Sequence, residues 1–224
     1  MIEFCRVLCI IVKMKTLLID CDGVLYPTEA LSMKDFVSAI QLTSAEFGIS
    51  EERYLDLGKR TKEEGAKGVY NFMQYLAKDA RCPMGEFKEQ MMAKLDYSKI
   101  TYNPELKEEM EKTARRYDIA IVSNNMRRHI YRVYNQVFQE SPESMNVAVV
   151  GIEDTQRDGV FYPKQTKEGI RFVCHHLGKE QGDCTLIDDT QRNLDVARGE
   201  GLQTVLITPE RNLTLVLREL QKSR

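Results

Sequence analysis

Two aspartates separated by a single residue lie in the segment KTLLIDCDGVL, residues 15–25. Side chains of an extended chain alternate between its two sides, so Asp20 and Asp22 project to the same side. Such a pair of carboxylates can bind a divalent cation, or one can act as a nucleophile while the other transfers protons. An Asp-Cys-Asp-Gly run is also compatible with an exposed turn, because aspartate and glycine favour turns. The surrounding elements therefore decide between these interpretations.

The apolar residues at 17–19 predict a buried β-strand that ends at Asp20. Further short apolar runs, separated by segments with helical spacing, predict strands at 119–123, 147–150, 185–187 and 204–207. Strands that alternate with helices predict an α/β fold, a Rossmann-like parallel sheet with helices on both faces. Ligands bind such sheets outside the carboxyl ends of the strands, so the polar residues at those ends are the candidates for function.

Residues 28–98 show helical rather than strand periodicity. Ser32 is placed to cap the first helix, and further helices are predicted to begin near residues 50, 69 and 83. We therefore predict a four-helix insert directly after the first strand. The expected domains are an α/β core of residues 1–27 and 99–224 and an α-helical cap of residues 28–98.

Polar side chains follow two further strands at the point where each ends. Ser123 and Asn124 follow the second strand, and Asp188 and Asp189 follow the fourth. Each pair also has a plainer interpretation, because serine and asparagine cap helices and aspartates are common in a first helical turn. The convergence of all of them at one edge of the sheet favours a joint functional site.

A lysine between the third and fourth strands is the remaining candidate. Lys164 follows a proline and a turn-like segment at 158–160. Most lysines are solvated, and Lys167 is the nearest competitor for the same role. The position of Lys164 after the proline singles it out.

These segments together resemble the four motifs of the haloacid dehalogenase superfamily, in the order in which its phosphatases carry them. The matching segments are LLIDCDGVL, AIVSNN, the lysine of FYPKQTKEGI, and LIDDTQRNLDVA. The resemblance extends over residues 15–207, and the order, spacing and strand context of the motifs make it specific. It implies a helical cap between the first and second motifs, where the predicted insert lies.

The resemblance implies a role for each aspartate of the first motif. Asp20 is expected to be the nucleophile that attacks phosphorus and forms an aspartyl-phosphate, which water then hydrolyses. Asp22 is expected to protonate the leaving oxygen and then deprotonate that water. These roles demand an ionised Asp20 and an Asp22 that holds a proton near neutral pH. Dehalogenases of the superfamily lack an acid at the position of Asp22, so its presence favours phosphate chemistry.

The resemblance also implies a bound Mg²⁺, which prefers hard oxygen ligands. The expected protein ligands are Asp20, the backbone carbonyl of Asp22, and Asp189. Asp188 is expected either to bind the metal itself or to contact the residues that bind it.

The phosphoryl group is expected to lie against Ser123, Asn124 and Lys164. Of these three, Ser123 and Lys164 are counted with the two aspartates of the first motif as catalytic residues. Asn193 and Asp195 resemble the polar residues that brace the loop after the fourth motif.

The expected function is a Mg²⁺-dependent phosphomonoester hydrolase for a small phosphorylated metabolite, a nucleotide or a sugar phosphate. The cap and the run IDCDGVLYP are similar to the pyrimidine 5'-nucleotidase and phosphoglycolate phosphatase branches, although Val24 stands where threonine is usual. β-Phosphoglucomutases share the Asp-Gly-Val form, so a sugar phosphomutase is the alternative, together with a catalytically silent binding protein of the same fold. Five polar residues of the cap have two interpretations: they contact the substrate, or they form an ordinary solvated helix face. These residues are Lys59, Arg60, Lys62, Lys67 and Tyr70.

The composition limits which partners the protein can bind and indicates in which cellular compartment it functions. The net charge of −2 balances 32 basic against 34 acidic residues, so we expect no nucleic-acid polymer as a partner. The six cysteines have no metal-binding spacing, which favours reduced cysteines in a cytoplasmic protein. The apolar stretch FCRVLCIIV is too short to span a bilayer and contains Arg6, so we expect no membrane partner. We interpret residues 1–13 as an extension of the reading frame ahead of Met14.

Overall fold

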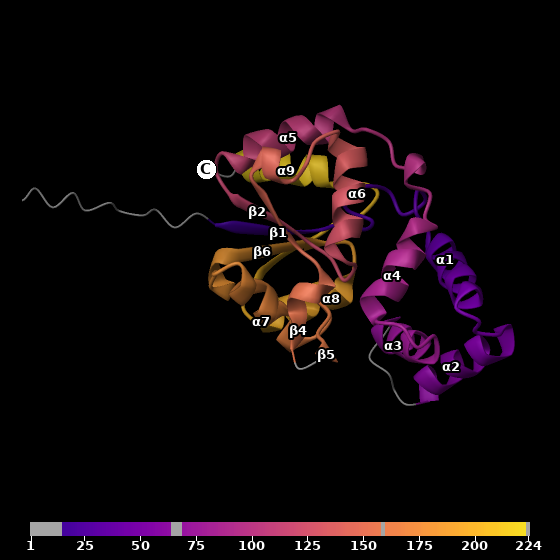
Figure 1. Cartoon of the computed structure of the whole chain (residues 1–224). Coiled ribbons are helices and arrows are strands. Elements are labelled where there is room, and N and C mark those ends of the chain that lie inside the picture. The colour runs from indigo at the N-terminus through magenta and orange to yellow at the C-terminus, as the bar shows by residue number, and fades with distance from the viewer. Residues whose placement is uncertain (1–14, 64–68, 158–159, 223–224) are drawn as a thin grey trace, which may run out of the picture.

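The computed structural model describes residues 15–63, 69–157 and 160–222. Its centre is a sheet of five parallel strands (Figure 1). Their order across the sheet is β3 (Val147–Val150), β2 (Asp118–Val122), β1 (Thr16–Asp20), β6 (Cys184–Asp188) and β7 (Gln203–Leu206). The predicted α/β class and parallel sheet are confirmed. The interpretation of residues 1–13 and the turn predicted at 158–159 concern residues outside the described ranges.

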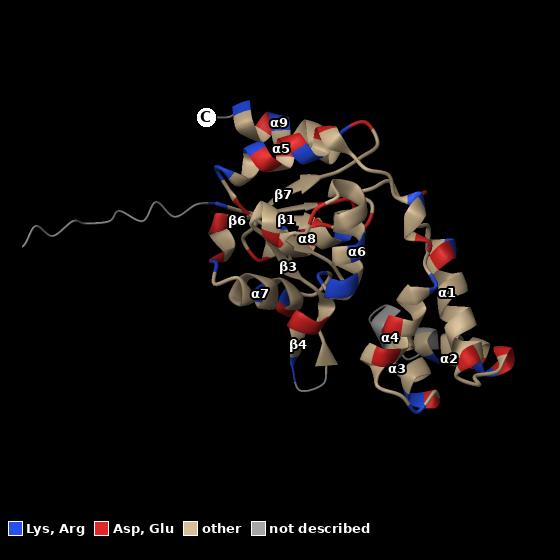
Figure 2. Cartoon of the chain, turned by 45° about the horizontal axis from the view of Figure 1, so that its top comes forward, with Lys and Arg blue, Asp and Glu red and all other residues tan. Residues whose placement is uncertain are grey.

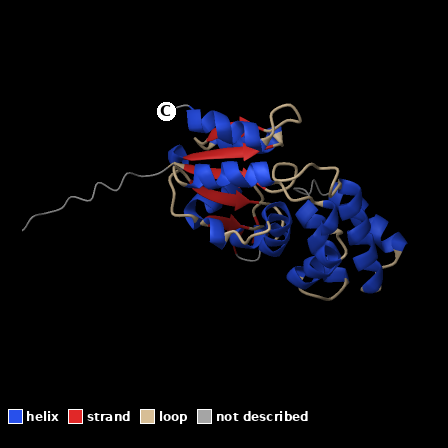
Figure 3. Ribbon diagram, turned by 90° about the horizontal axis from the view of Figure 1, so that it is seen from above, coloured by secondary structure: helices blue, strands red, loops and turns tan. Residues whose placement is uncertain are grey.

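Helices cover both faces of the sheet (Figures 1 and 3). Leu17 and Ile19 of β1 face one apolar cluster and Leu18 faces the other, as the alternation of side chains along a strand requires. The first face is covered by α5 (Pro104–Ala114), α6 (Arg127–Phe138) and α9 (Leu213–Lys222). The second is covered by α7 (Lys167–His176) and α8 (Gln191–Gly199). Because both faces are buried, the strands consist mainly of branched aliphatic residues.

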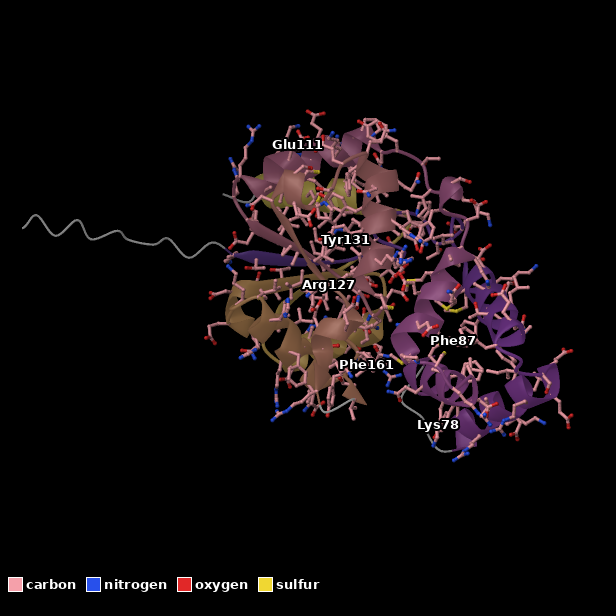
Figure 4. The ribbon with its side chains drawn as sticks, viewed as in Figure 1. Lys78, Phe87, Glu111, Arg127, Tyr131 and Phe161 are labelled. Atoms are coloured by element: carbon pink, nitrogen blue, oxygen red, sulfur yellow. The ribbon has the colours of Figure 1, made fainter. Side chains whose placement is uncertain are left out.

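A helical insert follows β1, as predicted, and lies beside the carboxyl ends of the strands (Figures 1 and 3). It comprises α1 (Met33–Glu46), α2 (Glu51–Glu63), α3 (Val69–Asp79) and α4 (Met84–Ala93). Ser32 caps α1 in a reciprocal capping box with Asp35, which fixes where the helix begins. Phe87 stacks on Phe47 inside the insert, and this apolar interior is continuous with the cluster under α6 (Figure 4).

A short antiparallel hairpin of β4 (Gln156–Arg157) and β5 (Val160–Phe161) was not predicted from the sequence. It follows η3 (Ile152–Thr155), a single turn of 3-10 helix. Strands this short show no periodicity, so the sequence carries no signal for them. Their position next to α3 and α4 brings Phe161 toward the insert (Figure 4).

Basic and acidic residues are mixed along the helices that the structure describes (Figure 2). On α9, Arg218 contacts Glu105 of α5 at 2.7 Å. Within the described ranges, the search for a helix long and apolar enough to cross a bilayer found none.

Candidate active site

The carboxyl ends of β1, β2 and β6 bring the predicted residues together. Asp20 is in register with Val122 of β2, and the preceding Ile19 is in register with Ile187 of β6. After β1 the chain builds β2 and β3 on one side of it and then β6 and β7 on the other. The strand order therefore reverses between β1 and β6, which is where open α/β sheets bind ligands.

Lys164 joins the ends of these three strands. Its Nζ lies 2.6 Å from Oδ1 of Asp20 and 2.8 Å from Oδ2 of Asp188, and it donates to the backbone oxygen of Val122 at 3.3 Å. The ammonium group thus uses all three donors although only 3% of the residue is exposed. Burial alone would lower the pKa of Lys164, but the two carboxylates raise it above its ordinary value. The competitor Lys167 is exposed at the start of α7.

Asp188 is wholly buried, and both oxygens of its carboxylate accept hydrogen bonds. Its Oδ1 accepts from the backbone N–H of Thr190 at 2.8 Å, and the amide of Asn193 donates to both oxygens at 3.0 and 3.1 Å. Although burial acts to raise the pKa of Asp188, Lys164 and these hydrogen bonds lower it. Asn193 therefore braces the loop after β6 in the way the sequence predicted, whereas Asp195 is exposed and contacts Gln191 and Arg198 on its own helix.

The side chain of Asp22 accepts hydrogen bonds on both oxygens. Oδ2 accepts from Ser123 Oγ at 3.2 Å and from Asn125 Nδ2 at 3.0 Å. Oδ1 accepts from the hydroxyl of Tyr26 and lies 2.8 Å from Nε2 of His129. Of these partners, sequence reasoning named only Ser123.

The other partners of Asp22 could hardly be recognised from the sequence. Asn125 was visible only as the last letter of the Ser-Asn-Asn run, and the wholly buried His129 is a lone histidine among the apolar residues of α6. Tyr26 directly precedes Pro27 in the connection to the insert; it stands in the run IDCDGVLYP, but no residue type or spacing there marks it as a partner of Asp22.

The two aspartates of the first motif have opposite pKa shifts. Burial raises the pKa of Asp20 well above its ordinary value, and the neighbouring Asp188 and Asp22 add to this effect against the opposing Lys164. Burial also acts to raise the pKa of Asp22, but His129 and the hydrogen bonds of Tyr26 and Asn125 lower it overall. The expected ionised Asp20 depended on Mg²⁺ as well as on Lys164, whereas these shifts arise from the protein groups alone, so the expected protonation states of the two aspartates stay a prediction.

Asn124 contacts the loop that carries Lys164. Its side-chain oxygen accepts from the backbone N–H of Lys164 at 2.8 Å, and its Nδ2 donates to Gln165 at 2.9 Å. The two asparagines after β2 therefore have different partners. Asn125 donates a hydrogen bond to Asp22, and Asn124 is hydrogen-bonded to the loop that positions Lys164.

Three carboxylates fit a divalent cation. Oxygens of Asp20, Asp188 and Asp189 all lie within 4.8 Å of one another. Together with Lys164 these groups carry a net charge of −2 when ionised, which Mg²⁺ would balance, and oxygen ligands suit it. Gly23 has φ +76°, and a Cβ at this position would lie 2.2 Å from Oδ2 of Asp189. Only glycine leaves the room that this carboxylate occupies.

A cleft of about 430 Å³ lies between the strand ends and the insert. From the sheet side it is lined by the polar residues Asp20, Asp22, Ser123, Asn124, Asn125, Lys164, Asp189 and Asn193. From the insert it is lined mainly by the apolar residues Leu31, Met33, Phe36, Ile40, Met73 and Met91.

Lys88 of α4 is the exception on the insert side. It is only 2% exposed, and burial lowers its pKa to about 7 although Glu153 acts to raise it. Lys88 also borders a second cavity of about 460 Å³, which lies between α3, α4 and the β4–β5 hairpin and is lined by Lys78 and Phe161 (Figure 4). Lys59 and Arg60 do not line the cleft, and the other three cap residues named from the sequence have side chains outside the described set.

Several solved structures share this fold. CbbY from Rhodobacter sphaeroides aligns with a TM-score of 0.57 and 16% identity, over 86% of this chain and 85% of its own. The enzyme BT-2542 from Bacteroides thetaiotaomicron gives 0.55 and 16%, over 91% and 98%. A putative β-phosphoglucomutase from Thermotoga maritima gives 0.52 and 18%, over 94% and 100%.

At the level of sequence, a search of curated proteins found no match. Residues 14–201 match the family described as haloacid dehalogenase-like hydrolase, and this match covers most of the chain. The motifs at the ends of β1, β2 and β6 and the insert after β1 agree with this match. The chain therefore belongs to the haloacid dehalogenase-like hydrolase family.

Proposed function

We propose that this protein is a Mg²⁺-dependent phosphomonoester hydrolase that forms an aspartyl-phosphate on Asp20. The observation that carries the proposal is the position of Lys164, whose ammonium group contacts both Asp20 and Asp188 at the strand ends. A phosphoryl group brought to Asp20 adds negative charge beside a carboxylate, and a buried cation at this point offsets that charge.

The reaction has two steps. In the first, a carboxylate oxygen of Asp20 attacks phosphorus, the bond to the leaving oxygen breaks, and Asp22 gives that oxygen a proton. In the second, water attacks the same phosphorus, its proton passes to Asp22, and Asp20 is released together with inorganic phosphate. Ser123 and Asn124 line the cleft beside Asp20, where we propose that they contact the phosphoryl oxygens.

Asp20 and Asp189, the backbone carbonyl of Asp22 and, directly or through a neighbour, Asp188 would hold the metal. Bound there, Mg²⁺ would neutralise charge on the phosphoryl oxygens and keep Asp20 ionised. A phosphate dianion beside Asp22 raises the pKa of that carboxyl, because like charges disfavour ionisation. Substrate binding thus moves Asp22 toward the protonated form that its first step requires.

The substrate we propose is a small phosphorylated metabolite, in a branch similar to the pyrimidine 5'-nucleotidases and phosphoglycolate phosphatases. A cleft of about 430 Å³ has room for a nucleotide or a sugar phosphate. Among the similar structures, CbbY was solved with phosphate and with xylulose-1,5-bisphosphate, and BT-2542 with magnesium and inorganic phosphate. These ligands support a phosphorylated substrate for this chain.

We further propose that residues 28–98 act as a cap and that the protein is cytoplasmic. The insert provides the apolar wall of the cleft and shields the reacting groups from water. The cysteines that the structure describes form no disulfide, which agrees with a reducing compartment.

Replacement of the nucleophile tests the proposal. With Mg²⁺ and p-nitrophenyl phosphate, Asp20→Asn is expected to lower kcat by at least about 10³-fold. Asp56→Asn makes the same chemical change at an exposed carboxylate of α2 and is the matched control, expected to keep wild-type activity. Full activity in a folded Asp20→Asn protein would refute the covalent mechanism.

A substrate panel separates the hydrolase from its alternatives. Nucleotides, sugar phosphates and phosphoglycolate are each supplied with Mg²⁺, and both free phosphate and isomerised sugar phosphate are measured. Free phosphate as the product supports the hydrolase. Isomerisation without phosphate release would indicate a phosphomutase, and no turnover of any ester would indicate a binding protein.

A further inference from the structure

A chain of hydrogen bonds leads from Asp22 to both connections between the sheet and the insert. Oδ1 of Asp22 accepts from the hydroxyl of Tyr26 at 2.5 Å and lies 2.8 Å from Nε2 of His129. The other ring nitrogen of His129, Nδ1, lies 2.8 Å from the hydroxyl of Tyr97. Tyr26 lies in the connection that leaves β1, and Tyr97 begins η1 (Tyr97–Lys99) in the connection that returns from α4.

The orientation of each hydrogen bond follows from the groups present. An ionised carboxylate only accepts, so Nε2 of His129 donates to Asp22, and in the neutral ring Nδ1 then accepts from the hydroxyl of Tyr97. Both nitrogens of the ring are then used. The ring is wholly buried and packs edge-on against Phe36 of α1, with centroids 5.7 Å apart.

The two oxygens of Asp22 have different surroundings. Oδ1 is bonded by Tyr26 and His129, which are both buried, whereas the donors to Oδ2 are Ser123 and Asn125, which line the cleft. One oxygen is thus fixed from behind while the other faces the space in which a leaving group would lie. A carboxylate that transfers a proton must present one oxygen within hydrogen-bonding reach of it.

We propose that His129 is a positioning residue for Asp22: it fixes the inner oxygen of the carboxylate and, through Tyr97, ties the orientation of Asp22 to the connection that returns from the insert. This inference rests on the proposed hydrolase function. A leucine in the same apolar surroundings would fill the space at lower desolvation cost, but it would leave the inner oxygen of Asp22 held by Tyr26 alone. We therefore expect His129 to affect the proton transfers of Asp22, of which the one to the leaving oxygen occurs during phosphoenzyme formation.

Leaving-group dependence provides the test. Single-turnover rates of phosphoenzyme formation are measured with 2,4-dinitrophenyl phosphate, whose leaving group needs no proton, and with an alkyl phosphate, whose leaving group does. His129→Leu is expected to lower the alkyl rate by about 10²-fold and to leave the dinitrophenyl rate within about threefold of wild type. His129→Gln, which restores an N–H donor, is expected to recover at least about tenfold of the alkyl rate. The exposed His176 provides the matched control, His176→Gln, with wild-type rates for both esters.

Tyr97→Phe removes a single hydroxyl and keeps the proposal testable if His129→Leu does not fold. It is expected to lower the alkyl rate by about three- to tenfold with the dinitrophenyl rate unchanged. Tyr131→Phe is its control, because Tyr131 of α6 (Figure 4) does not line the cleft and its hydroxyl contacts Glu143. Equal losses for both esters, or no loss for either, would overturn the role of His129. If the wild-type protein cleaved neither ester, the hydrolase function would fail first and this inference would fail with it.

Discussion

Lys164 and Lys88 are equally buried and line the same cleft, yet their pKa values shift in opposite directions. Lys164 lies on the sheet side, where Asp20 and Asp188 raise its pKa. Lys88 lies on the insert side, among Met73 and Met91, where burial lowers its pKa to about 7 despite Glu153. Burial is the same in both cases, so the neighbouring carboxylates decide the sign.

The two lysines lie on walls of the cleft that differ in chemical character. The sheet wall gathers opposite charges from the ends of β1 and β6 and from the loop before α7, and hydrogen bonds hold them in place. Fixed groups suit a reaction that needs a defined geometry. The insert wall is apolar around one buried cation, which suits contact with the part of a substrate beyond its phosphoryl group. Changes to the two lysines are therefore expected to have different consequences.

Lys164→Ala is expected to have the largest effect. It leaves the buried carboxylates of Asp20 and Asp188 without the cation between them, which should cost about 3–5 kcal/mol of unfolding free energy. The loss of charge stabilisation should lower kcat by about 10²–10³-fold. Urea unfolding and phosphate release measure the two effects, with Lys167→Ala at the exposed neighbouring lysine as the control. Wild-type stability in Lys164→Ala would show that this pairing is not what holds the sheet wall together.

Lys88→Met is expected to stabilise the protein by about 1–4 kcal/mol, since it replaces a buried cation by an apolar side chain of similar length. The folded pKa of about 7 lies below the ordinary 10.5, so the unfolded chain binds the additional proton between these values. The cost of burying Lys88 is therefore full below about pH 7 and declines toward pH 10.5.

Thermal unfolding at pH 6 and pH 9 checks this prediction. The gain in stability should be larger at pH 6, and Lys78→Met, at an exposed position of α3, should show no such dependence. A loss of stability at both pH values would mean that the electrostatic attraction of Glu153 outweighs the cost of burying Lys88, and the contrast between the two walls would disappear.

Mg²⁺ binding is expected to change stability less than Lys164→Ala and within the range given for Lys88→Met. At about 100 times its Kd, the ion should stabilise the protein by about 2.7 kcal/mol, or about 5–10 °C in Tm. Because burial raises the pKa of Asp20 and of Asp189, protons compete with the metal, and the shift in Tm should be smaller at pH 5 than at pH 7.5.

The raised pKa of Asp20 also determines how stability depends on pH when no metal is bound. The contribution of Asp20 to stability is full below its ordinary pKa of 3.8 and is lost as the pH rises toward its folded value, so the protein in EDTA should lose this contribution as the pH increases. Asp189→Asn should abolish the Mg²⁺ effect, and Asp56→Asn should retain it. An equal Tm shift in Asp189→Asn would place the metal elsewhere.

Much of this fold was predictable because each element is short and locally determined. The aliphatic runs of β1 and β6 have the uninterrupted pattern of strands buried on both faces, and Ser32 caps α1 through residues only three positions away. The β4–β5 hairpin was missed because its strands are too short to show a period.

The sequence by itself determined which residues meet at the carboxyl ends of the strands, because parallel strands place their ends at one edge of the sheet. Asp20 and Asp188 converge there for this reason, and the loop before α7 brings Lys164 to them. Only the tertiary structure decided what surrounds them. His129 of α6 contacts Asp22, Tyr97 contacts His129 from the connection after α4, and Lys88 reaches the cleft from α4. Contacts between residues so distant in the chain depend on how helices pack, and no local pattern encodes them.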